Sequence, residues 1–357
     1  MLPTLQLLER LMACKPVTAD VAAVNEAVEI LRQYLEEHQV YTEVETLDGR
    51  KLLFAATRAG KTQDVVLNAH LDVVPAPAEM FDIRAAEKGW VAGRGAGDCL
   101  GNAAVLAQVL VRLNGKVGVG GAFSTDEETG GKTTRCFVDR GYRARRLYCV
   151  MDGDGYALIV GQKGVISLTL TAVGTSCHAA KPWEGENALD RLVTSYCRVR
   201  ELFPPVSADD SWHPTMAPVI CHAGDTANKV PERAEMSLNI RYTDSENGDL
   251  IVDRIRRESG LDVRVDMQCD PVVFSEKTPV LQRMLESMRS HLGQNVLIKR
   301  LDGATDARHF ADQQVPIAII GLPHRGLHGD GEAMEASAIP AYEDFLLDFL
   351  ADSEVFS

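Results

Sequence analysis

The chain has 357 residues, of which 45% are hydrophobic and 25% are charged, a composition typical of soluble globular proteins. This length exceeds what one small core requires and predicts two domains. Because 37 Lys and Arg residues stand against 51 Asp and Glu residues, the net charge is −14. This excess of acidic residues argues against nucleic-acid phosphates or an anionic membrane surface as the binding partner.

The first half of the chain alternates short apolar runs with helical patterns. Residues 1–17 carry apolar side chains at helical spacing and predict an amphipathic helix instead of a signal peptide. No apolar run reaches the ~20 residues that span a bilayer. Buried strands are predicted at 64–70, 117–124 and 145–151, with a helix at 100–113. Strands that alternate with helices favour an α/β fold, with a mostly parallel sheet covered by helices on both faces.

From about residue 164 the pattern changes to strand, helix, strand, strand, helix, strand, which is typical of a small α+β domain. The segments are 164–174, 186–203, 217–224, 234–244, 249–259 and 261–268. The α/β pattern then resumes with a strand at 315–322 and a helix at 341–353. We therefore expect an α/β domain formed by 1–163 and 275–357, with an inserted α+β domain at 164–274. The eight cysteines form no Cys-x-x-Cys pair, which favours reduced thiols in a cytoplasmic protein.

Histidine or carboxylate side chains follow the apolar runs, where the loops of an open α/β sheet bind ligands. They are His70 and Asp72, Asp98, Asp126 to Glu128, Asp152 and Asp154, and His324 and His328. Each has an ordinary alternative, such as a strand-end histidine, a helix N-cap at Asp98, or a surface turn. Together, imidazole and carboxylate without a thiolate pair favour a hydrolytic zinc, cobalt or manganese site.

Ordered motifs along nearly the whole chain resemble the M20 family of metallopeptidases and deacylases. This family includes carboxypeptidases, aminoacylase-like enzymes, succinyl-diaminopimelate and acetylornithine deacylases, and peptidase T. The motifs are HLDVVP (70–75), GRGAGDCLG (93–101), DEETGG (126–131), KGVISLTLTAVGTSCHAAKP (163–182), GENAL (185–189), NKVP (228–231), GATDAR (303–308) and HGDGE (328–332).

The resemblance implies a metal-dependent hydrolase that cleaves an amide bond of a small peptide or N-acyl amino acid with a metal-activated water. It implies two divalent ions, with zinc expected and cobalt or manganese as alternatives, and a homodimer formed through a lid-like inserted domain. The implied metal ligands are His70, Asp98 as the bridge, Glu128, Asp152 and His328. Two alternatives stay open at this point, Asp154 in place of Asp152 and His324 in place of His328.

Five further residues receive roles from the same resemblance. Glu127 is implied as the general base, and Asp72 as the residue that orients His70. Arg241 is implied to bind the substrate carboxylate with help from Asn228. His178 is implied to reach the partner's active site and stabilise the oxyanion. An exposed strand arginine and a surface histidine are the alternatives for Arg241 and His178.

Two rival functions follow from the sequence. A cysteine hydrolase would use Cys177 and His178, but neighbouring residues on a strand face opposite sides and form a dyad poorly. A catalytically inactive relative that binds peptide-like ligands would not need Glu127. Cys99, beside Asp98, is not expected to be a nucleophile, and Leu100 stands where the family usually has lysine, which we interpret as a packing change.

Overall fold

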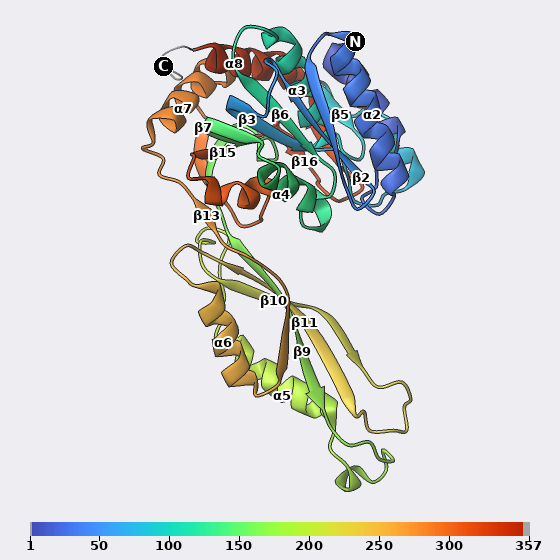
Figure 1. Cartoon of the computed structure of the whole chain (residues 1–357). Coiled ribbons are helices and arrows are strands. Elements are labelled where there is room, and N and C mark those ends of the chain that lie inside the picture. Colours follow the sequence, from blue (N-terminus) through green and yellow to red (C-terminus); the bar gives the residue numbers. More distant parts are fainter. Residues whose placement is uncertain (1, 353–357) are drawn as a thin grey trace. The chain divides into compact units, whose positions relative to one another are not determined.

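The computed structural model describes residues 2–352, so Ser353 of the expected closing helix lies outside them. The chain divides into two compact units (Figure 1). The first is Met1–Val160, Phe274–Lys299 and Thr305–Ser357, and the second is Gly161–Val273 and Arg300–Ala304. The expected domains did not include this return of 300–304 to the second unit. Its cause is that Asp302 pairs with Lys163 at 2.7 Å and Arg300 lies over the Trp212 ring.

The large sheet has the strand order β1-β2-β6-β3-β7-β15-β8-β13. The four central strands β6, β3, β7 and β15 run parallel, and β1, β2 and β8 pair antiparallel at the two sides. The strands are β1 (Tyr41–Leu47), β2 (Arg50–Ala56), β3 (Thr62–His70), β6 (Val119–Ser124), β7 (Arg143–Val150), β8 (Ala157–Gln162), β13 (Val272–Val273), β14 (Leu297–Leu301), which pairs with β8, and β15 (Ile317–Ile319).

Helices pack on both faces of this sheet, as the sequence predicts. Leu53 and Ala55 of β2 face the main core with α1, α2, α3, α7 and α8, while Phe54 between them contacts Phe137 of α4 and Tyr142. This alternation follows from the two-residue period of a strand. The helices are α1 (Pro3–Ala13), α2 (Val21–Glu37), α3 (Leu100–Leu113), α4 (Lys132–Asp139), α7 (Pro279–Leu292) and α8 (Ile339–Ala351).

A small separate sheet joins two distant parts of the first unit. Its order is β16-β17-β5-β4, and all of its neighbouring strands pair antiparallel. Residue Ala333 lies opposite Ala92, so the loop after β5 and the loop between β16 and β17 come together. The strands are β4 (Arg84–Ala85), β5 (Trp90–Ala92), β16 (His324–Arg325) and β17 (Ala333–Glu335).

The second unit is a four-stranded antiparallel sheet in the order β10-β11-β9-β12, covered by two helices. Side chains of β11 alternate between buried and partly exposed, and the buried set packs with α5 and α6. The elements are β9 (Gly164–Val173), α5 (Ala188–Arg200), β10 (Thr215–Ala223), β11 (Arg233–Tyr242), α6 (Gly248–Ser259) and β12 (Asp262–Cys269). The predicted α/β fold with an α+β insertion is confirmed. Among the described residues, no helix is long and apolar enough to cross a bilayer.

Candidate dinuclear metal centre

The residues at the ends of three parallel strands, and directly after them, lie at one edge of the central sheet. β3 ends at His70, which lies opposite Ser124 at the end of β6. A 3₁₀ turn (Glu127–Thr129) follows β6, and Asp152 follows the end of β7. Because the carboxyl ends of parallel strands meet at the same edge, residues far apart in the sequence converge there.

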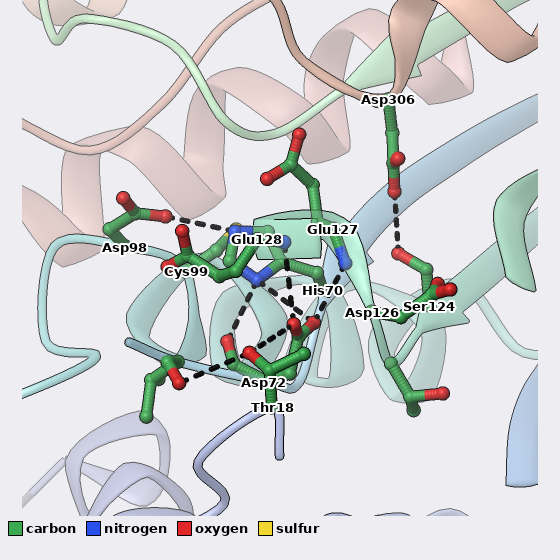
Figure 2. Close-up of polar contacts among 12 residues, drawn as sticks. Thr18, His70, Asp72, Asp98, Cys99, Ser124, Asp126, Glu127, Glu128 and Asp306 are labelled. Atoms are coloured by element: carbon green, nitrogen blue, oxygen red, sulfur yellow. Dashed lines mark hydrogen bonds and ion pairs between the residues drawn. The ribbon is translucent and has the colours of Figure 1, made fainter. Parts of the chain in front are cut away.

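Asp98 lies between two histidines. Its Oδ1 is 2.9 Å from His70 Nε2, and its Oδ2 is 3.1 Å from His328 Nε2 (Figure 2 shows the His70 contact). Asp98 is followed by Cys99, the N-cap of α3, and its carboxylate is largely buried. One imidazole on each oxygen of a single carboxylate is the arrangement expected of a residue that bridges two cations.

Potential ligand atoms form two groups, one of which includes Asp98. His70, Cys99 and Asp152 make one group, and Asp98, Glu128 and His328 make the other, with the atoms of each group within 4.8 Å of one another. Glu128 Oε2 is 3.2 Å from His328 Nε2, whereas its buried Oε1 has no hydrogen-bond partner among residues 2–352. A buried carboxylate oxygen without a donor is costly unless a cation occupies the site.

The electrostatics of this cluster also fit bound cations. Burial, together with the negative charge of Asp98, raises the pKa of Asp152 well above its usual range. Burial raises the pKa of Glu128 to about 6, and burial with the charge of Asp306 raises the pKa of Glu127 to about 8. Carboxylates that repel one another in a desolvated pocket become stable as anions when positive charge is present. Imidazole and carboxylate donors are suited to zinc, cobalt or manganese.

Asp72 contacts both His70 and the turn that carries Glu127 and Glu128. Its backbone oxygen is 2.9 Å from His70 Nδ1, nearer than its carboxylate Oδ1 at 3.5 Å. The carboxylate accepts the backbone N–H groups of Glu127 at 3.1 Å and Glu128 at 3.4 Å, and the Thr18 hydroxyl at 2.8 Å (Figure 2). Asp72 therefore contacts His70 mainly through its main chain and holds the 3₁₀ turn through its side chain.

Several polar residues of the site carried no sequence prediction. Arg308 lies 3.5 Å from Glu127 Oε1, and both side chains are largely buried. Asp306 accepts the Ser124 hydroxyl at 2.7 Å and also the Thr134 hydroxyl. Arg308 and Asp306 belong to the GATDAR motif, but the sequence alone indicates no role for either residue.

The competing ligand candidates lie in different surroundings. Asp152 and His328 lie in the two groups of ligand atoms. Asp154 instead forms an ion pair with Lys299. His324 is in β16, where it lies opposite Met334.

The remaining predicted site residues lie in the second unit, at two different ends of it. His178 forms a β-bridge with Lys229, and Asn228 O accepts the N–H of Ala179 at 2.9 Å, so His178 and Asn228 share one tip. Arg241 Nε donates to Asn239 Oδ1 at 3.0 Å near the other end of β11. Cys177 Sγ contacts the Lys181 carbonyl and His178 Nδ1 accepts the Ala180 N–H, so both face backbone groups.

Residues 66–352 match the family described as Peptidase family M20/M25/M40. The chain belongs to this family. It is 27% identical over 372 residues to succinyl-diaminopimelate desuccinylase of Paracoccus denitrificans, with 94% of each chain covered. It is also 29% identical over 235 residues to a probable carboxypeptidase of Aspergillus niger, covering 59% of this chain and 56% of the relative. This M20 protein is therefore a hydrolase that acts on amide bonds.

Solved structures share its fold at low sequence identity. A tripeptidase from Staphylococcus aureus superposes with a TM-score of 0.82 at 17% identity, covering 98% of this chain and 97% of the other. An M20 family metallo-carboxypeptidase from Sulfolobus solfataricus gives 0.81 at 15% identity, with 98% and 99% covered. A dinuclear metal binding peptidase of this family from Bacillus subtilis gives 0.64 at 14% identity, with 91% of each chain covered.

The raised pKa of Glu127 predicts how the stability of the metal-free protein depends on pH. Between the ordinary value of 4.5 and about 8, folded Glu127 keeps a proton that the unfolded chain has lost. The free energy of unfolding must therefore fall as the pH rises through this range. We expect the melting temperature of chelator-treated protein to fall from pH 5.5 to 8, and to fall less in Glu127→Gln.

Glu79→Gln is the control for this measurement, because Glu79 is exposed and outside the site. It should follow the wild-type pH dependence. An equal slope in Glu127→Gln and the wild type would show that Glu127 does not hold a proton in the folded state.

Proposed function

We propose that this chain is a dinuclear metallohydrolase that cleaves an amide bond of a small peptide or an N-acyl amino acid. The observation that carries the proposal is the position of Asp98, with His70 on one carboxylate oxygen and His328 on the other. The name of the Bacillus subtilis structural neighbour supports a dinuclear centre in the family.

The proposed ligands are His70, Asp98 and Asp152 for one ion, and Asp98, Glu128 and His328 for the other. Zinc is the metal we propose, with cobalt and manganese as alternatives, because the donors are imidazoles and carboxylates. When bound, the ions would activate a water molecule and polarise the scissile carbonyl.

Glu127 is the proposed general base. It is not in either group of ligand atoms but is the neighbour of Glu128 on the 3₁₀ turn held by Asp72. In the reaction, its carboxylate takes the proton of the attacking water and gives it to the leaving amine. The water oxygen bonds to the carbonyl carbon while the C–N bond breaks, so the products are a carboxylic acid and an amine. Arg308, 3.5 Å away, offsets negative charge on Glu127.

The proposed substrate carries a free carboxylate near the scissile amide, bound by Arg241 with help from Asn228. A guanidinium suits this role because its planar fork pairs with both carboxylate oxygens. Among relatives, the desuccinylase and the probable carboxypeptidase have names that fit substrates of this kind.

A homodimer is supported by distances within the second unit. Asn228 precedes β11, and Arg241 is the ninth residue of that strand, which separates them by more than about 27 Å at a rise of ~3.4 Å per residue. An extended dipeptide spans only about 7 Å. One small substrate can therefore contact Arg241 and also His178 and Asn228 only if these residues come from two chains, with Arg241 from one chain and His178 and Asn228 from the other.

An outer strand of the second unit offers a place for this pairing. β10 is at the edge of its sheet, and its Val219 and Ile220 are 57% and 53% exposed. Exposed edges of this kind pair readily with another chain.

We further propose a cytoplasmic location, which the eight unpaired cysteines support.

Separate substitution of the neighbouring residues Glu127 and Glu128 tests the proposed chemistry. Protein prepared without chelator should contain two metal ions per chain, and activity toward N-acyl amino acids, dipeptides or tripeptides should be lost with a chelator. Glu127→Gln should keep both metals but lose on the order of 10²-fold or more in kcat. Glu128→Gln should instead lower the metal content. Metal binding without turnover of any substrate would favour the inactive relative, and full activity without metal would overturn the proposal.

Arg241→Ala tests carboxylate binding. We expect KM to rise sharply for substrates with a free carboxylate and to change little for their carboxamide analogues, because only the carboxylate pairs with the guanidinium. Arg233→Ala is the matched control, since Arg233 is on the same strand in an exposed ion pair with Glu235. Equal effects of Arg241→Ala on both substrate classes would contradict the assignment.

Mixing two inactive variants tests whether His178 acts in the partner. His178→Ala should keep the metals and lower turnover about 10²–10³-fold, as expected for loss of an oxyanion donor. A mixture of Glu127→Gln and His178→Ala chains should regain activity, because a mixed dimer holds one site with both groups. If chain exchange is demonstrated and activity does not return, or if a monomer is fully active, His178 does not act in trans.

A further inference from the structure

A buried ion pair links the loop that carries Asp98 to the loop that carries His328. Arg94 Nη1 contacts Glu332 Oε2, and their side chains are 3% and 0% exposed. The two residues are 238 positions apart in the sequence. Neither belongs to the two groups of candidate ligand atoms.

Glu332 holds the backbone of the Asp98 loop. Its Oε1 accepts the N–H groups of Gly95 at 2.9 Å, Gly97 at 3.1 Å and Asp98 at 3.2 Å. Three donors on one oxygen fix the loop in the conformation that presents the Asp98 carboxylate.

Arg94 holds the backbone of the other loop. Its Nη2 donates to His328 O at 3.1 Å and Gly329 O at 3.4 Å. His328 has a φ of 61°, a left-handed conformation that non-glycine residues adopt only when their surroundings impose it. The guanidinium supplies part of that restraint while it is itself held by Glu332.

We propose that the Arg94–Glu332 pair is a positioning pair that sets the separation of Asp98 and His328 for metal binding. The proposal rests on the dinuclear centre proposed above and concerns the ion held by Asp98, Glu128 and His328. A buried ion pair usually contributes little more to stability than a well-packed apolar pair, so its value here lies in fixing two loops. The other ion shares only Asp98 with this one, and its other proposed ligands, His70 and Asp152, receive no hydrogen bond from the pair, so it should be less affected.

Metal titration of metal-free protein tests this role. We expect Glu332→Gln to bind one of two zinc ions 10–100-fold more weakly, as is typical when residues that orient ligands are changed. With cobalt(II), the visible absorption of the weakened site should change, while that of the other site persists. The single variant leaves a buried charge without its ionic partner and can unfold for that reason. The double variant Arg94→Met/Glu332→Leu replaces both charged side chains by apolar ones of similar size, so the test can also be made in a folded protein. In this double variant, amides 95–98 should exchange hydrogen faster at an unchanged melting temperature.

Asp302→Asn is the control, because it removes the carboxylate partner of a buried cation, Lys163, in the second unit. It should bind both zinc ions like the wild type. Wild-type affinity for both ions in the folded double variant would overturn the positioning role. Wild-type protein that binds neither zinc, cobalt nor manganese would refute the dinuclear centre itself, which keeps the two failures distinguishable.

Discussion

The structure depends on several carboxylates being buried together at one edge of a parallel sheet. These carboxylates are of two kinds. Asp72 and Glu332 accept hydrogen bonds on both carboxylate oxygens. Asp306 accepts the Ser124 and Thr134 hydroxyls on Oδ2, so it is also an anchor, although its Oδ1 has no hydrogen-bond partner among residues 2–352. Glu128 leaves one oxygen without a donor among residues 2–352, and Asp152 has a strongly raised pKa. Only added positive charge makes the second kind stable as anions, and the anchors fix where that charge can sit.

The anchors also explain how loops can form a rigid site. Asp72 holds the turn with Glu127 and Glu128, Asp306 ties the end of β6 to α4, and Glu332 holds the Asp98 loop. Each carboxylate connects segments that are distant in the sequence. Because these anchors hold the loops that carry the ligand side chains, less ordering is required when a cation binds.

Periodic segments were predictable from the sequence, and contacts between distant residues were not. The helix expected at 100–113 is α3, because its apolar pattern directly reflects burial. The strand expected at 315–322 is only Ile317–Ile319, since Pro316 lacks an N–H and Gly321 and Pro323 follow. Strands of two or three residues, such as β5 and β17, are too short to show a period. The five expected ligands lie together, but their roles remain predictions, and nothing local in the sequence indicates that Arg94 meets Glu332.

The small sheet that pairs β17 with β5 has a consequence for how the protein is synthesised. Ala333 lies opposite Ala92, and His328 follows Asp98 by 230 positions in the sequence, because 328 − 98 = 230. During translation, His70, Asp98, Glu128 and Asp152 all leave the ribosome long before His328 does. The nascent chain must therefore carry an incomplete cluster of acidic side chains until the segment with His328 has been synthesised.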